Sequence, residues 1–189
     1  MLNHYLHRIK VHLVKTHSSV LDKFNLGQEA KDFRPLDGGW SISEILEHIA
    51  LTSHFLLILI DKGAAKAQRN TRNLSLEVAL QEFHYDLSAI ETIGIHKSFD
   101  WIRPEHMEPA GVKSEMEITD ELISQLKRCL VHLEDLRNGE GVLYQTMMTV
   151  NGLGKINVYE YIYFLSKHAE RHLAQIDENV AEFNERHPA

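Results

Sequence analysis

The segment from Tyr159 to Ile176 constrains the fold most, because it predicts a long helix with one buried face. His168 and His172 lie four residues apart on that face. Side chains at this spacing on a helix are neighbours, about 5–6 Å apart at Cβ. The apolar residues of the segment recur at steps of three and four, the period of one helical face: Tyr161, Leu165, Leu173 and Ile176. The two imidazoles are therefore placed to ligate one metal ion.

A second segment, residues 38–60, offers a third imidazole. There His48 shares a helical stripe with Ile45, Thr52, Phe55 and Leu59. The chain has thirteen histidines, and outside these two segments we find none with a companion at ligand spacing on an apolar face. The candidate metal ligands are therefore His48, His168 and His172. Spacing alone leaves a second interpretation open, in which each imidazole bonds to a hydroxyl in the core.

Helical stripes recur along the rest of the chain and predict an all-α protein. Ser41 with Glu44, and Asn157 with Glu160, have the spacing of helix-capping pairs. The section 64–74 is expected to be a loop, 99–112 irregular, and 142–156 a short extended segment followed by a turn. The predicted helices cover residues 2–24, 42–62, 75–94, 117–137 and about 157–183. This pattern predicts a four-helix bundle with an additional helix in the long connection between its second and third helices.

The chain has 189 residues, of which 43% are hydrophobic and 25% charged. This is the composition of an ordinary globular protein. We expect a single domain over residues 1–189, in the cytoplasm and with no membrane segment, since the longest apolar run, Phe55–Ile60, is short. The net charge of -7 disfavours nucleic acid as a partner. Cys129, the one cysteine, lies on an apolar stripe and is expected to be a buried structural thiol.

Two segments resemble the signature regions of the DinB-like superfamily of metal-binding helical bundles, which includes the bacillithiol transferases. Trp40, Ser41 and His48 match the first region. The second region, a late helix with HxxxH followed by Gln-Ile, is matched by His168, His172, Gln175 and Ile176. The resemblance implies a bundle of up-down-down-up order, one divalent metal ion on the three histidines, and a homodimer. It is weak over residues 64–114.

The predicted donor set has a chemical consequence. Three neutral imidazoles leave the ion its full charge and at least one open position, as in catalytic sites. Nitrogen ligands suit zinc, nickel or iron, and such an ion activates a bound water or thiol near neutral pH. Glu44 and Gln175 are candidates to bond to the ligands or to a metal-bound water, together with Glu47 and Glu170.

Three functions remain open at this point. The resemblance implies a metal-dependent S-transferase that uses a low-molecular-weight thiol, or a hydrolase, acting on a small molecule in detoxification or stress response. The second is a non-enzymatic metal-binding or structural bundle. The third is a bundle without metal, whose histidines are satisfied within the core.

Overall fold

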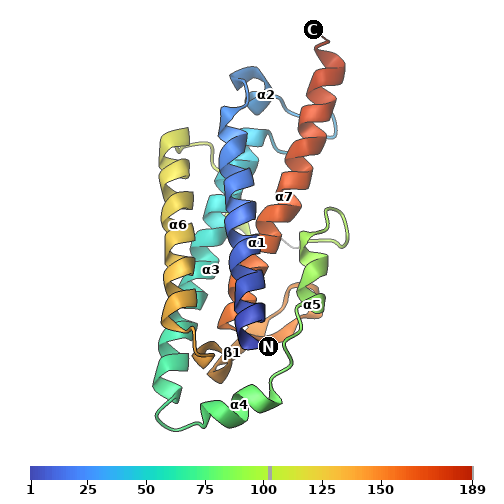
Figure 1. Cartoon of the computed structure of the whole chain (residues 1–189). Coiled ribbons are helices and arrows are strands. Elements are labelled where there is room, and N and C mark those ends of the chain that lie inside the picture. Colours follow the sequence, from blue (N-terminus) through green and yellow to red (C-terminus); the bar gives the residue numbers. More distant parts are fainter. Residues whose placement is uncertain (102–103, 189) are drawn as a thin grey trace.

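The computed structural model describes residues 1–101 and 104–188 and is built on four long helices (Figure 1). α7 packs against α1 and α3, and α6 packs against the same two helices, which closes a four-helix bundle. The chain ascends in α1, descends in α3 and α6, and ascends in α7 (Figure 1). The all-α bundle of up-down-down-up order is therefore confirmed. The bounds are α1 Leu2–Asp22, α3 Ile42–Asn70, α6 Glu115–Asp135 and α7 Val158–Arg186.

Shorter elements fill the connections. Between α3 and α6 the expected single helix over 75–94 is divided into two, because residues 83–87 are not helical. The short helices and strands are α2 Gln28–Asp32, α4 Leu76–Glu82, α5 Ser88–Glu91, β1 Gln145–Met148 and β2 Gly154–Asn157. Single turns of 3₁₀-helix cover Lys23–Asn25, Thr92–Gly94, Glu105–Met107, Glu140–Leu143 and Val150–Gly152.

The expected extended segment before α7 is one strand of a small antiparallel hairpin. β1 pairs with β2 in a register that sets Thr146 opposite Ile156. The reversal between the strands passes through Asn151, whose φ of 47° is left-handed, a conformation that asparagine tolerates better than most residues. The hairpin delivers the chain to the start of α7.

The predicted end of the second helix at residue 62 is wrong. α3 continues to Asn70, so residues 64–70 of the expected loop are helical. Gly63 is buried inside the helix, and a Cβ there would lie 3.2 Å from Cγ2 of Val158. The glycine allows the start of α7 to approach α3 closely, instead of ending the helix.

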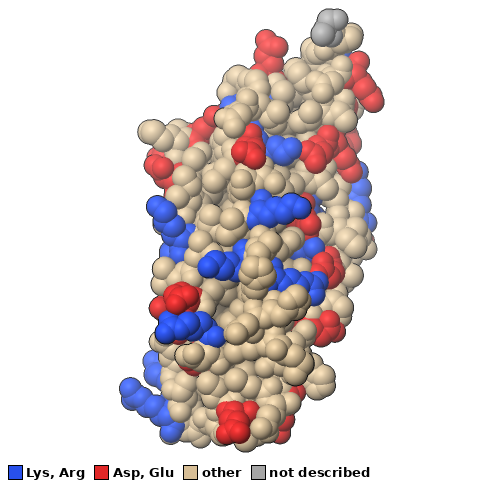
Figure 2. Space-filling model, in the orientation of Figure 1, with Lys and Arg blue, Asp and Glu red and all other residues tan. Residues whose placement is uncertain are grey.

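The apolar surface of α3 is accounted for by packing inside the bundle. Among the described residues, only this helix is long and apolar enough to cross a membrane by length and composition, with a mean hydropathy of 1.4 over 18 residues. However, 61% of that window is buried, and the core helix of a soluble protein passes the same test. On the face shown in Figure 2, basic and acidic side chains are interspersed over the molecule.

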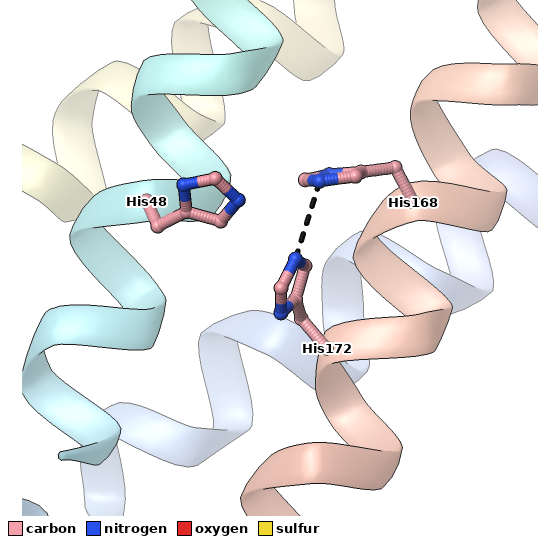
Figure 3. A group of neighbouring side chains, drawn as sticks. All are labelled: His48, His168 and His172. Carbon is pink, nitrogen blue, oxygen red and sulfur yellow. Dashed lines mark hydrogen bonds between the residues drawn. The ribbon is translucent and has the colours of Figure 1, made fainter. Parts of the chain in front are cut away.

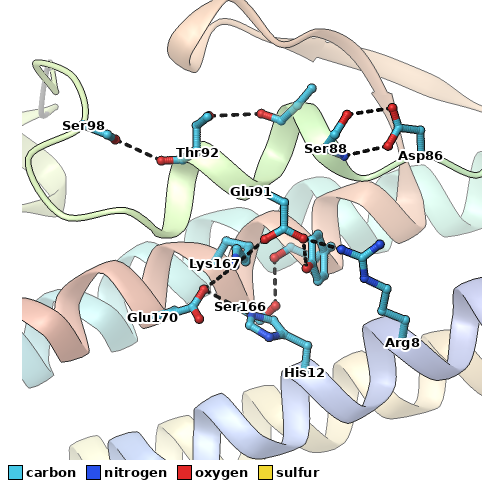
Figure 4. A network of polar contacts seen from close by, with 12 residues as sticks. Arg8, His12, Asp86, Ser88, Glu91, Thr92, Ser98, Ser166, Lys167 and Glu170 are labelled. Carbon is cyan, nitrogen blue, oxygen red and sulfur yellow. Dashed lines mark hydrogen bonds and ion pairs between the residues drawn. The ribbon is translucent and has the colours of Figure 1, made fainter.

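A network of ion pairs fastens the long connection to the bundle (Figure 4). The Glu91 carboxylate, at the end of α5, accepts hydrogen bonds from Arg8 at 2.5 Å and from the Tyr163 hydroxyl at 2.6 Å. It also pairs with Lys167 at 2.7 Å, and Lys167 pairs in turn with Glu170. Because Lys167 is nearly buried, its two carboxylate partners offset the cost of removing its charge from water. The connection is thereby held beside α1 and α7.

Hydrogen bonds at the helix starts match the predicted capping pairs. Ser41 Oγ accepts from the Glu44 amide at 3.3 Å, and the Ser41 amide donates to the Glu44 carboxylate at 2.8 Å. Asn157 and Glu160 form the same box at the start of α7. Each box fixes the first turn of a helix that carries a candidate ligand.

Replacing Ser41 by alanine removes one half of its box. We expect Ser41→Ala to lower the free energy of unfolding by about 1 kcal/mol, because the Glu44 amide loses its acceptor. Urea unfolding followed by circular dichroism measures the change. Ser18→Ala, on the exposed face of α1, removes the same hydroxyl without a cap and is the control. Equal stability of both variants would contradict the role of this cap.

Candidate metal centre

The structure brings the three predicted histidines together at the interface of α3 and α7 (Figure 3). They lie in the interior, with exposed fractions of 3% for His48, 3% for His168 and 8% for His172. One potential ligand atom from each lies within 4.8 Å of those of the other two. The ring centroids are 4.6 to 5.2 Å apart. Two helices therefore present three buried imidazoles to one point.

Hydrogen bonds to the outer nitrogens orient two of these rings. Nδ1 of His48 lies 2.7 Å from the carbonyl oxygen of Met107, and Nδ1 of His172 lies 2.9 Å from Oε1 of Gln175. Because both partners are acceptors, each Nδ1 carries the proton in the neutral ring. Nε2 of each ring then keeps a lone pair for a metal, which is the tautomer that metal-ligating histidines use when Nδ1 is bonded.

The spacing of the inner nitrogens fits a metal ion. Nε2 of His168 and Nε2 of His172 are 3.2 Å apart, close to the roughly 3.3 Å between two ligands of a tetrahedral ion with bonds of about 2.0–2.1 Å. In the metal-free arrangement, Nε2–H of His168 can donate to Nε2 of His172. A metal ion would replace this bond, so the residues present fit the ion that the donor set predicts.

Burial keeps the imidazoles of His168 and His172 neutral. Removal from water lowers the pKa of His168 well below its ordinary value, and the neighbouring His172 and His48 lower it further. For His172 the same causes, burial first and then His48, lower the pKa to about 3. Neutral rings are required for ligation. His168 and His172 therefore present uncharged donors across the physiological range.

The three imidazoles border a pocket with room for a small molecule. Its volume is about 580 Å³. Trp40 packs on the His48 ring at 4.7 Å between centroids, and Trp101 packs on the His168 ring at 5.5 Å. Trp101 therefore lines this pocket together with Trp40. The other walls are mainly apolar and include Leu56, Leu59, Met107, Met147, Met148, Val150 and Phe164.

The candidate supporting residues occupy different places. Gln175 contacts the site, because its amide oxygen lies 2.9 Å from Nδ1 of His172. Glu44 lies in the capping box of α3 and also pairs with Arg34 at 2.5 Å. Glu47 accepts from the Gly111 amide at 2.8 Å, and Glu170 pairs with Lys167. Of the four, the structure brings only Gln175 into hydrogen-bond contact with an imidazole of the centre, as far as the described residues show.

Two contacts of His48 differ in how far the sequence predicts them. The acceptor for His48 is a backbone carbonyl at Met107, on a 3₁₀ turn of the irregular connection. Thr52, one turn after His48, places its hydroxyl 3.4 Å from Nε2 of that ring. The Thr52 contact follows from helical spacing, whereas a carbonyl 59 residues away depends on how the connection folds.

Cys129 is confirmed as a buried thiol. It lies in the apolar core, and burial raises its pKa to about 12. Because the thiolate is the reactive form of cysteine, this thiol is inert at neutral pH. It has no part in the site.

Comparison with known proteins agrees with this geometry. The sequence model of the DinB superfamily matches residues 13–176. The chain belongs to the DinB superfamily. The match spans all three histidines of the site and most of the four-helix bundle of this DinB protein. Searches of curated proteins and of solved structures found no match.

The depressed pKa values predict acid sensitivity of the metal-free protein. The unfolded chain binds protons below about pH 6.5, whereas the folded His168 and His172 do not. Stability is therefore present above pH 6.5 and is lost as the pH falls toward 3, by about 2 kcal/mol for each such histidine between pH 6.5 and 5. Urea unfolding of chelator-treated protein at pH 7 and pH 5 measures the loss.

His168→Ala should lose about 2 kcal/mol less than the wild type over the same interval, because one buried titrating group is gone. His54→Ala, which removes an exposed histidine of α3, is the control and should follow the wild type. If His168→Ala and the wild type lost stability equally between pH 7 and 5, the histidine would not be held neutral by the fold.

Proposed function

We propose that this DinB protein is an enzyme in which one divalent transition-metal ion, held by His48, His168 and His172, acts on a small molecule in the adjoining pocket. The observation that carries the proposal is the pocket of about 580 Å³ at the three histidines. A purely structural ion has all its positions filled by protein, whereas a catalytic ion keeps one for solvent or substrate. Among the described residues, the histidine cluster contains no fourth metal-binding side chain.

The reaction class that fits best is transfer of a low-molecular-weight thiol to an electrophile, with hydrolysis as the second candidate. The ion would act as a Lewis acid and lower the pKa of a thiol or water. The imidazoles hold the ion, while Met107 and Gln175 fix the orientation of two of them. The apolar walls suit an electrophile with an apolar body and exclude water from it.

The alternative function is a metal ion that only stabilises the bundle. The pocket argues against it, since a stabilising ion gains nothing from an access route lined by apolar side chains. A detoxification role and a homodimer remain proposals that rest on the resemblance to thiol transferases.

Metal content tests the first step. Protein purified without added metal should contain about one equivalent of zinc, nickel or iron, and His168→Ala should contain little. His54→Ala is the control and should keep the metal. Saturating metal at 100 times its dissociation constant should stabilise the wild type by about 2.7 kcal/mol. A wild type that is metal-free and takes up neither zinc nor nickel would contradict the metal centre.

Turnover tests the second step. The metal-loaded protein should accelerate the reaction of a small thiol such as cysteine or glutathione with monochlorobimane, and His168→Ala should not. A metal-loaded protein that accelerates neither thiol transfer nor ester hydrolysis would favour the stabilising ion.

A further inference from the structure

One side chain of the pocket wall carries a charge that the proposed metal chemistry does not use. Arg171 lies between the two histidines of α7 in sequence and lines the same pocket. Its exposed fraction is only 8%. Burial lowers the pKa of the guanidinium from its ordinary value, but an arginine stays charged in proteins. The pocket therefore has a buried positive charge in its wall.

The contacts of Arg171 do not neutralise this charge. One nitrogen, Nη1, donates to the carbonyl oxygen of Ile95 at 2.5 Å. The guanidinium lies over the rings of Phe99 and Trp101, 5.3 and 5.2 Å from their centroids, and these two rings are stacked on each other. Among the described residues, no carboxylate lies within ion-pair distance of it.

The other buried cations of the described chain are paired. Lys31 lies 2.5 Å from the Glu115 carboxylate, and Lys167 lies between Glu91 and Glu170. A buried charge without a counter-ion is costly, and a guanidinium has five N–H donors in a fork that fits a carboxylate. Among the buried cations that the structure describes, only Arg171 departs from this pattern, and it lines the pocket.

A second hydrogen-bond donor of a pocket-lining residue also lacks a partner among the described residues. Nε1–H of Trp101 is buried and has no hydrogen-bond partner among the described residues. The indole of Trp101 contacts both the guanidinium of Arg171 and the imidazole of His168. The same indole thus contacts both the cation and one of the candidate metal ligands. No aspartate or glutamate is among the described residues that line the pocket.

We infer that Arg171, which lies over the Trp101 indole, recognises an anionic group, a carboxylate on an otherwise apolar molecule, and directs that molecule to the three histidines. This inference rests on the proposed function in one respect, namely that the ligand is the substrate or the thiol of the reaction. A ligand carboxylate supplies the missing counter-ion, while the methionine and aromatic walls bury the apolar remainder. Arg171 is a binding and positioning residue.

Tryptophan fluorescence measures binding directly, since Trp40 and Trp101 are the two tryptophans of the chain and both line the pocket. The protein as purified is titrated with 3-phenylpropionate and with 3-phenylpropanamide, which differ only in the charge. A second pair, N-acetylcysteine and N-acetylcysteine amide, tests whether the carboxylate belongs to the thiol. We expect about tenfold tighter binding of the carboxylate in at least one pair. The pair with the larger preference identifies the source.

Three variants assign the preference to the arginine. For Arg171→Gln, the dissociation constants of the acid and the amide should lie within about twofold of each other, and that of the amide should equal the wild-type value. Arg171→Lys keeps the charge and should keep part of the preference. Arg186→Gln, an exposed arginine of the same helix, is the control and should behave as the wild type. Circular dichroism and metal content are measured for each variant.

Repeating the titrations after metal removal separates this inference from the metal centre. If the carboxylate still binds more tightly than the amide after chelation, the protein itself recognises the carboxylate. If this difference is lost, the carboxylate binds the metal ion, and the role of Arg171 is overturned. Equal binding of acid and amide in both pairs, in both states, would also overturn it, even if Arg171→Gln did not fold. If the protein as purified holds no metal, takes up neither zinc nor nickel, and still prefers the acid, the proposed enzyme is contradicted and the anion site stands.

Discussion

The burial of three imidazoles between α3 and α7 is the constraint on which the rest of the structure depends. Each ring has two nitrogens that need hydrogen-bond or metal partners, and a buried nitrogen without a partner lowers the stability of the fold by about 1–3 kcal/mol. The apolar core is divided into two clusters, one on either side of a polar layer that includes Thr52, Ser166 and His168. Fixed helix starts and outer hydrogen bonds to Met107 and Gln175 keep the inner nitrogens directed at one point. Without a metal ion, Nε2 of His168 and Nε2 of His172 share a proton and Nε2 of His48 lies beside the Thr52 hydroxyl; a metal ion would take the place of these contacts.

The chain order explains why a pocket lies beside this layer. α3 and α6 are neighbours that run in the same direction, and parallel neighbours cannot be joined by a short loop. The connection must return along the length of the bundle. On the way it packs on α1 and α7 through the Glu91 network and brings Trp101 and Met107 against the histidines. The up-down-down-up order thus supplies the wall of the pocket.

Much of this arrangement is predictable from the sequence, for identifiable reasons. Periodicity marks the four long helices, and capping residues such as Ser41 and Asn157 mark two of their starts. The same periodicity places His48, His168 and His172 on inward faces. The end of α3 was mispredicted, because Gly63 has a packing role that depends on Val158. Trp101, Met107 and Arg171 gain their roles from the way the long connection between α3 and α6 folds against the bundle, and no local pattern specifies such long-range contacts.

Charge is the final argument for the kind of molecule that this site accepts. Three neutral imidazoles would leave a divalent ion with its full charge, and Arg171 adds another positive charge to a pocket whose described lining contains no acidic side chain. A structural site would offset such charge with protein carboxylates or thiolates, as Glu91 and Glu170 do for Lys167. Under the proposed function, the compensating charge would come from the bound ligand. An anionic ligand, whether carboxylate, thiolate or both in one molecule, balances the pocket, and a neutral one does not.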